Sequence, residues 1–163
     1  MRFPRARGTS GLEWVGAARL RSLSLVKFRL TSDMKLQRLD HFGLEVTDLE
    51  RAERFYTEVL GLSVVTRMGD QVLLDCGGQN LALFAVTRAP LAPAERAARI
   101  ANPLGRGHHA FRVSDADFSV ARERLAAAGV ETARPIDWGD HDCLYFLDMD
   151  GNLLEVVTYR ERT

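Results

Sequence analysis

The chain has 163 residues and a mass of 18.2 kDa, enough for one domain with a substantial hydrophobic core. Lys and Arg together number 22, as do Asp and Glu, so no net charge attracts nucleic acid or an anionic membrane surface. No run of about 18 apolar residues occurs, which excludes a membrane-spanning helix. The two cysteines, Cys76 and Cys143, lie far apart, which favours reduced thiols in a cytoplasmic protein over a disulfide framework.

The first 34 residues differ from the remainder of the chain in charge. Residues 1–33 contain seven basic and two acidic residues, whereas 15 basic and 20 acidic residues follow. An Arg-rich, acid-poor leader is typical of targeting segments, although this one lacks the sustained apolar core of a secretory signal. The alternative, which we favour, is that Met34 is the natural start and residues 1–34 are a flexible, non-native extension. We therefore expect the folded domain at residues 35–160.

Residues 36–87 and 107–159 repeat one order of elements: a strand, a helix and three more strands. In the first copy, alternation with period two predicts strands, and a T-x-x-E capping box at Thr47 predicts the start of a helix that ends at Gly61. The four expected strands are 38–46, 62–68, 71–76 and 80–86.

The second copy shows the same signals. Ser114 begins a helix that ends at Gly129, and the turn residues D-M-D-G-N join the last two strands as a hairpin. The four expected strands are 108–113, 130–136, 143–147 and 153–157. Between the copies, residues 93–101 are expected to form a short connecting helix.

Glu155 is an isolated carboxylate in the apolar last strand, so it needs a partner, either a cationic or backbone donor or a metal ion. His41 and His108 occupy equivalent positions in the two copies. Strand alternation places both on the face away from the core, each next but one to a small residue, Gly43 or Ala110. A lone histidine in a strand is usually structural. Two at equivalent positions, together with one carboxylate, predict a metal site.

Three stretches, L-D-H-F-G-L-E-V, H-H-A-F-R-V and L-Y-F-L-D-M-D-G-N-L-L-E-V, resemble the vicinal oxygen chelate superfamily. This superfamily groups glyoxalase I, bleomycin-resistance proteins, fosfomycin-resistance thiol transferases and type I extradiol dioxygenases. The resemblance implies an α+β fold in which two β-α-β-β-β modules form a cupped, partly closed mixed sheet with helices outside. It also implies one divalent metal ion held by His41, His108 and Glu155, and a homodimer. Whether one chain or two chains complete each site stays open.

The fourth ligand of glyoxalase I, a carboxylate on the last strand of the first module, has no counterpart. Overlaying the two copies sets Leu83 against Glu155, and residues 77–86 contain no acid. The remaining set of two histidines and one carboxylate is typical of non-haem ferrous oxygenases. We therefore expect Fe²⁺, with Mn²⁺, Zn²⁺ or Ni²⁺ as alternatives, acting as a Lewis acid and template.

The end of the chain also resembles the extradiol dioxygenase signature. The resemblance implies that Tyr145 donates a hydrogen bond to an oxygen at the metal and that His141 transfers a proton. The alternatives are a packed strand aromatic for Tyr145 and a solvated loop residue for His141. Met149 replaces the usual Pro of that signature, and Gly43 stands where fosfomycin-resistance enzymes have a substrate-contacting Thr.

Three further residues are candidates for substrate binding. Arg112 and Glu45 occupy equivalent positions on the cup face, and we favour a salt bridge between them over a role of Arg112 in holding a substrate carboxylate. Trp138 lies in the loop before the final hairpin and is either a lid over the pocket or an aromatic contact with a neighbouring subunit.

These features predict a metal-dependent, dioxygenase-like enzyme that acts on a small substrate with two adjacent oxygens. A glyoxalase-like isomerase (a lyase) or a thiol transferase is the runner-up. A metal-free protein of the bleomycin-resistance type, which sequesters a ligand, is the alternative from another class. We expect a small-molecule substrate and neither a nucleic-acid nor a membrane partner.

Overall fold

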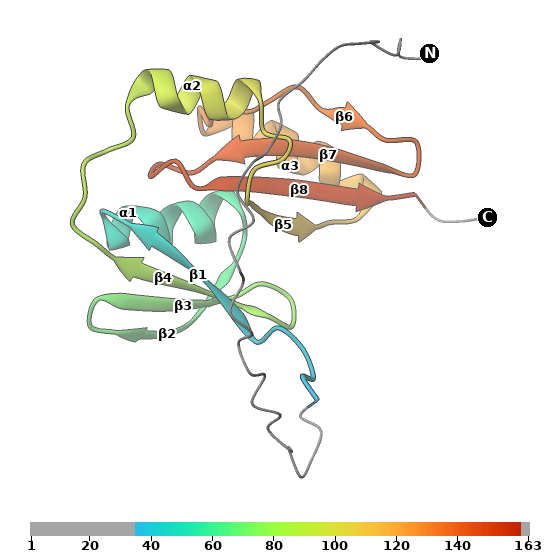
Figure 1. Ribbon diagram of the computed structural model, residues 1–163. Helices are drawn as coiled ribbons and strands as arrows, with labels where there is room; N and C mark the ends of the chain where they lie inside the picture. Colours follow the sequence, from blue (N-terminus) through green and yellow to red (C-terminus); the bar gives the residue numbers. More distant parts are fainter. Residues whose placement is uncertain (1–34, 161–163) are drawn as a thin grey trace, which may run out of the picture. The chain divides into compact units, whose positions relative to one another are not determined.

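A computed structural model describes residues 35–160 of the chain (Figure 1). The extension predicted at residues 1–34 lies outside the described residues, as do residues 161–163. One structural unit begins at Gln37 and contains every helix and strand described below. Between residues 35 and 160 there is no helix with the length and hydropathy needed to cross a membrane.

The first module begins with a strand and a short helix that continues as a π-helical turn. Asp48 caps this helix by accepting a hydrogen bond from the backbone N–H of Arg51. The predicted cap at Thr47 is therefore wrong by one residue, because the backbone N–H and hydroxyl of Thr47 both donate to Asp150 instead. The elements are β1 (His41–Val46), α1 (Leu49–Arg54), the π-helical turn (Phe55–Val59), β2 (Ser63–Met68), β3 (Gln71–Asp75) and β4 (Asn80–Ala85).

The second module follows the connecting helix at the predicted position. Ser114 caps its long helix, as predicted, by accepting from the backbone N–H of Asp117. The strand predicted at 130–136 is wrong, since only its last residue forms a strand, and Pro135 has no N–H to donate to a ladder. The elements are α2 (Pro93–Ala101), β5 (His109–Arg112), α3 (Asp115–Ala127), β6 (Ile136–Asp137), β7 (His141–Leu147) and β8 (Leu153–Tyr159).

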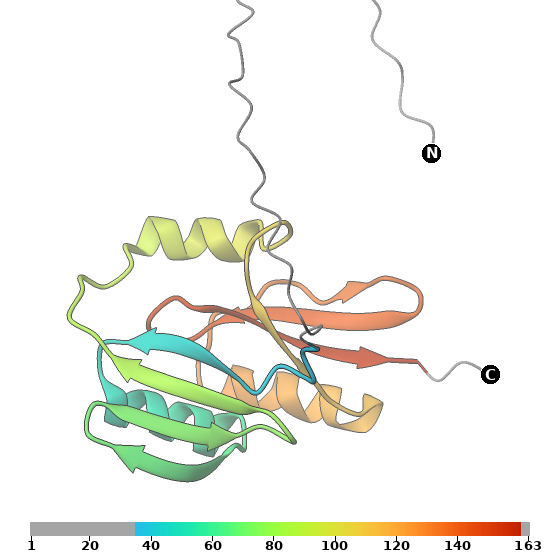
Figure 2. The same ribbon diagram turned by 60° about the horizontal axis from the view of Figure 1, so that its bottom comes forward.

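The strands form two four-stranded mixed sheets with the same topology, β1-β4-β3-β2 and β5-β8-β7-β6 (Figure 2). In each sheet the first strand of the module pairs in parallel with the last, and the other pairs are antiparallel. The predicted α+β class and the two β-α-β-β-β modules are confirmed. The two sheets are not closed into a barrel.

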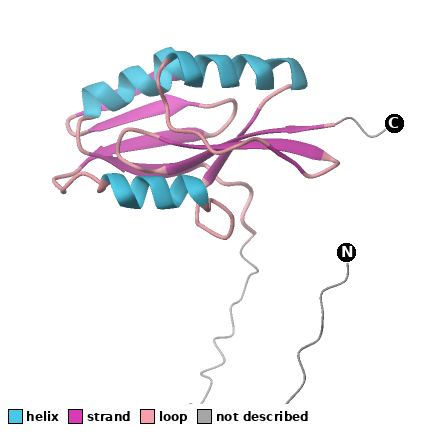
Figure 3. Ribbon diagram, turned by 90° about the horizontal axis from the view of Figure 1, so that it is seen from above, coloured by secondary structure: helices cyan, strands magenta, loops and turns pink. Residues whose placement is uncertain are grey.

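The two sides of the sheets are covered differently. Helices α1 and α3 lie on one side, where the inward side chains of both modules share one core that includes Leu44, Tyr56, Leu125 and Phe146 (Figure 3). Helix α2 lies on the other side and packs through Ile100 against the second sheet. Glu155 lies on that second side, so α2 packs against the face on which the metal site is predicted.

The turn between β7 and β8 connects the two modules. Asp148 is 1% exposed, and its carboxylate accepts a hydrogen bond from the Tyr56 hydroxyl at 2.8 Å. From α2, Arg96 and Arg99 donate to the backbone carbonyls of Asp148 and Gly151. Hydrogen bonds from both modules and from α2 therefore hold the end of the hairpin that positions Glu155.

Candidate functional site

Glu155 lies on β8 and is only 6% exposed, and its partner is His108. Nε2 of His108 is 2.7 Å from a carboxylate oxygen of Glu155. The pair sits on the α2 side of the second sheet, because Leu154 and Val156 take the alternate positions and enter the core on the opposite side. The structure thus brings together two of the three predicted metal ligands.

The contact between these two side chains requires a cation. Nδ1 of His108 lies 2.8 Å from the backbone carbonyl oxygen of Arg106, which only accepts, so Nδ1 carries the hydrogen. In a neutral imidazole, Nε2 then presents a lone pair to the carboxylate oxygen of Glu155 at 2.7 Å. Two acceptors at that distance are stable only if a proton or a metal ion binds there. A proton gives an ion pair, and a divalent metal ion accepts both lone pairs.

His41 begins β1, and its side chain is 55% exposed. Its Nδ1 lies 3.1 Å from a carboxylate oxygen of Asp40, so Nε2 is the ring nitrogen that Asp40 does not contact. In residues 35–160, no three His, Cys, Asp or Glu side chains gather closely enough to hold one metal ion. Within a single chain, the structure therefore does not bring His41 to His108 and Glu155.

Tyr145 lies beside the pair, as expected for a residue of the site. It is the cross-strand neighbour of Glu155, and its ring meets the His108 ring edge to face with centroids 5.1 Å apart. Burial, and then the negative charge of Glu155, raise the pKa of the Tyr145 hydroxyl above its ordinary value. The phenol therefore keeps its proton at neutral pH and is able to donate a hydrogen bond.

The counterpart of Glu155 in the first module is Ala82 and not Leu83. Glu155 pairs with Ala110 across β5 and β8, and the equivalent pair across β1 and β4 joins Gly43 to Ala82. Leu83 is fully buried in the shared core on the other side of the sheet. The overlay was wrong by one residue because the loops of the two modules differ in length. A carboxylate is absent at Ala82 as well.

The predicted salt bridge between Arg112 and Glu45 does not form within the chain. Glu45 pairs with Arg88, with 3.3 Å between Nη1 and the carboxylate oxygen. The guanidinium of Arg112 instead lies over the Tyr159 ring, 5.1 Å from its centroid. Since Ala110 lies on the face of Glu155, Arg112 lies on that face too, two residues farther along β5.

His141 and Trp138 lie at the same end of the sheet as Arg112. The His141 ring stacks on Tyr159 at 5.1 Å and on Trp138 at 6.1 Å between centroids. Nδ1 of His141 contacts Asp140 at 2.6 Å. His141 pairs with Tyr159, four residues beyond Glu155 along β8, which corresponds to about 13 Å of strand. Proton transfer by His141 and a lid or subunit contact by Trp138 stay predictions.

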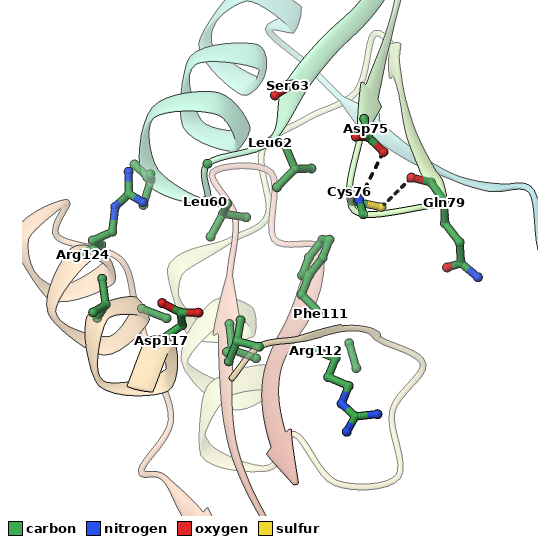
Figure 4. A pocket seen from close by; sticks show the side chains of 18 of the residues that line it. Leu60, Leu62, Ser63, Asp75, Cys76, Gln79, Phe111, Arg112, Asp117 and Arg124 are labelled. Atoms are coloured by element: carbon green, nitrogen blue, oxygen red, sulfur yellow. Dashed lines mark hydrogen bonds between the residues drawn. The ribbon is translucent and has the colours of Figure 1, made fainter. Parts of the chain in front are cut away.

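A cavity of about 670 Å³ lies on the helix side of β5 (Figure 4). Phe111 points into it toward Leu62 and Cys76, whereas Arg112, which also lines it, directs its guanidinium away from Phe111. None of the three predicted metal ligands is among the described residues that line it. The cavity and the His108–Glu155 pair are therefore separate features.

Four contributors to the site were not anticipated from the sequence. Asp40 and the carbonyl of Arg106 orient the two histidines, Arg88 neutralises Glu45, and Tyr159 supports Arg112. Strand alternation contains a signal for Tyr159, since it lies four residues after Glu155 and so faces the same side. For the carbonyl of Arg106 no such signal exists, because every residue has a backbone carbonyl.

Residues 38–156 match the sequence profile described as the Glyoxalase/Bleomycin resistance protein/Dioxygenase superfamily. The chain belongs to this superfamily. The family predicted from the sequence patterns, whose other name is the vicinal oxygen chelate superfamily, is thereby confirmed. Superfamily members include metalloenzymes, so a divalent metal ion and a small-molecule substrate are features of the group.

Relatives within the glyoxalase superfamily have different activities. Glutathione transferase FosA of Serratia marcescens is 34% identical over 122 residues, which cover 74% of this chain and 80% of the relative. Metapyrocatechase 2 of Cupriavidus necator is 32% identical over 121 residues, which cover 72% of this chain but only 32% of the relative. The crystal structure of a glyoxalase/dioxygenase from Nostoc punctiforme superposes with a TM-score of 0.64 at 23% identity, covering 81% of this chain and 99% of the other.

Proposed function

We propose that the protein is a divalent-metal-dependent enzyme that acts on a small substrate with two adjacent oxygens. The contact between Nε2 of His108 and the buried carboxylate of Glu155 supports this proposal most directly, because it brings together at 2.7 Å two atoms of the types that bind divalent metal ions, and without a metal ion a proton must lie between them. The donor set of two imidazoles and one carboxylate suits Fe²⁺, with Mn²⁺, Zn²⁺ and Ni²⁺ as alternatives.

His41 is the third proposed ligand, and we place it in the site of a second copy of the chain. Each histidine is held through Nδ1, by Asp40 or by the carbonyl of Arg106, so that Nε2 is the nitrogen able to bind a metal. The exposure of His41 within one chain is consistent with a ligand supplied across a homodimer interface. We therefore propose a homodimer with two shared sites. We also propose a cytoplasmic location, because the two cysteines are unbonded and the cytoplasm keeps thiols reduced.

The protein's own groups have distinct roles in this site. When bound, the metal ion supplies Lewis acidity and a positive charge that favours an anionic oxygen pair. The neutral Tyr145 hydroxyl donates a hydrogen bond to a substrate oxygen, and its burial keeps water from competing for that position. His141 and Trp138 lie at the far end of the sheet, about 13 Å of strand from Glu155, where the Asp140 contact orients the His141 ring.

Thiol transfer is the first reaction to test. The relative named glutathione transferase FosA matches over 80% of its length, and three protein ligands leave room for a bidentate substrate. Dioxygenation is the second candidate, favoured by the two-histidine, one-carboxylate set and by the match to part of metapyrocatechase 2. A four-ligand isomerase site is disfavoured because Ala82 takes the place of the fourth ligand.

Metal analysis of protein purified without chelators tests the proposal. We expect about one metal ion per chain in wild type and a loss of affinity of more than about 100-fold in His108→Ala and Glu155→Gln, since even second-shell partners contribute 10–100-fold. His109→Phe is the matched control, because His109 is adjacent but stacks on Phe42 at 4.5 Å, on the core side of the sheet.

The identity of the bound metal, together with the activity measured, would distinguish between the two candidate reactions. Iron, with oxygen uptake on a catechol panel, would favour dioxygenation, whereas manganese, zinc or nickel with consumption of glutathione would favour thiol transfer. Wild-type protein that stays empty after metal is supplied would contradict the proposal and support a metal-free protein that sequesters its ligand.

A further inference from the structure

Arg112 lies on the face of the second sheet that carries the proposed metal ligands. Ala110 on β5 pairs with Glu155 on β8, and Arg112 pairs with Val157 one pleat repeat farther along. The backbone of Arg112 is therefore about 7 Å along the strand from the position opposite Glu155. A substituted aromatic compound held at His108 and Glu155 would span this backbone separation.

Aromatic rings hold the Arg112 side chain in place without neutralising it. Its guanidinium carbon lies 5.1 Å from the Tyr159 ring centroid, and Tyr159 stacks on His141, which stacks on Trp138. Figure 4 shows the guanidinium directed away from Phe111. A cation over an aromatic ring is stabilised, yet it keeps its charge and its hydrogen-bond donors for a ligand.

The acids nearest Arg112 along the sheet pair with other arginines, and Asp115 and Asp117, which line a cavity together with Arg112, form no ion pair with it. Glu45, its expected partner, lies 3.3 Å from Arg88. At the end of the sheet, Arg160 forms ion pairs with Asp137 at 2.9 Å and with Asp142 at 3.1 Å. Among residues 35–160, no carboxylate lies within ion-pair distance of Arg112. A positive charge thus remains on the proposed substrate face.

We infer that the substrate carries an anionic substituent that Arg112 binds while the adjacent oxygens of the substrate occupy the metal site. This inference rests on the proposed function and narrows it to small bidentate oxygen compounds with a carboxylate or similar anion at the opposite end. The planar fork of an arginine suits a carboxylate, because two parallel N–H donors meet its two oxygens. Arg112 would then determine specificity, and Tyr159 would position it.

Two matched catechols test this inference by binding rather than by turnover. Iron-loaded protein, oxidised to the ferric state, gains visible absorption when a catechol binds the iron, so titrations yield a Kd for each compound. We expect 3,4-dihydroxyphenylacetate to bind about 10-fold or more tightly than the neutral 4-ethylcatechol, as a hydrogen-bonded charge pair would give. Arg112→Met should reduce the preference to less than about 2-fold, and Arg112→Lys should keep part of it.

Arg160→Met is the matched control, since Arg160 lies at the same end of the sheet but already pairs with Asp137 and Asp142. It should keep the preference for the carboxylate. Equal binding of the two catechols to wild type, or loss of the preference in Arg160→Met but not in Arg112→Met, would overturn the inference and leave the metal site intact. Protein that takes up no metal would contradict the proposed function itself, and this inference with it.

Discussion

Asp148 shows how one buried residue links the stability of this fold to pH. Its carboxylate accepts hydrogen bonds from Tyr56, from the backbone N–H of Asp150 and from the backbone and side chain of Asn152. Burial nevertheless raises the pKa of Asp148 above its ordinary value. Because the folded protein then binds this proton more tightly than the unfolded chain does, the contribution of Asp148 to stability falls as pH rises from the unfolded pKa, about 4, toward the raised one.

We predict that Asp148→Asn makes the free energy of unfolding less dependent on pH in that window. The variant should be less stable overall, since an amide nitrogen would face the donors from Tyr56 and Asn152. However, its stability should decline less steeply than that of wild type above pH about 4. Urea unfolding at a series of pH values measures both effects, with the exposed Asp70→Asn as control. Parallel pH profiles for wild type and Asp148→Asn would refute this interpretation.

At the residue scale, the sequence was most informative where strand parity decided the outcome. Parity places His108 on the face away from the core, and in the structure its ring lies 2.7 Å from the Glu155 carboxylate. Strand parity could not predict that Arg88 would form an ion pair with Glu45. Arg88 lies in the connection after β4, where no periodic pattern fixes the direction of a side chain. Arg112 thereby loses its expected partner.

At the element scale, the β7–β8 turn depends on one glycine. Gly151 has φ of +83°, and a Cβ added there would lie 2.5 Å from Cδ2 of Leu91. Gly129 also has positive φ, +67°, but a Cβ there would meet no atom within 4 Å. Comparing substitutions at Gly151 and Gly129 therefore separates the energetic cost of backbone strain from that of steric crowding.

We predict that Gly129→Ala lowers the free energy of unfolding by about 1 kcal/mol and Gly151→Ala by about 2 kcal/mol. Shortening the crowding side chain, with Leu91→Ala in the Gly151→Ala background, should remove the extra cost relative to Leu91→Ala alone. Chemical denaturation measures each difference. If Gly151→Ala cost no more than Gly129→Ala, Leu91 would not constrain the turn.

Periodicity also limited what could be predicted of the elements. Strands with clear alternation, such as β4 and β5, were predicted to within one residue or two. The 130–136 segment was predicted as a strand from its place in the repeat, but with Pro135, which has no N–H to donate, it forms only an isolated bridge at Thr132 before β6. The overlay of the modules failed by one residue at Ala82 because register depends on loop geometry, which a sequence pattern does not contain.

At the scale of the whole molecule, the two modules share one core through α1 and α3, yet His41 stays apart from His108 and Glu155 within the described chain. The equivalent positions of the two histidines, together with Glu155 and the family resemblance, predicted the three ligands but left open which chain supplies each one. Local patterns cannot settle that question, because both arrangements use the same strands and the same faces. We propose that two chains complete each site.

Mixed dimers test this central claim most directly. His41→Ala and His108→Ala chains, carrying different tags, would be co-expressed, and the heterodimer isolated through both tags for metal analysis. If the site is shared, one site of the heterodimer retains both histidines and the other has neither, so we expect about one metal ion per heterodimer and almost none in either parent homodimer. A heterodimer as empty as its parents would contradict a site shared between chains.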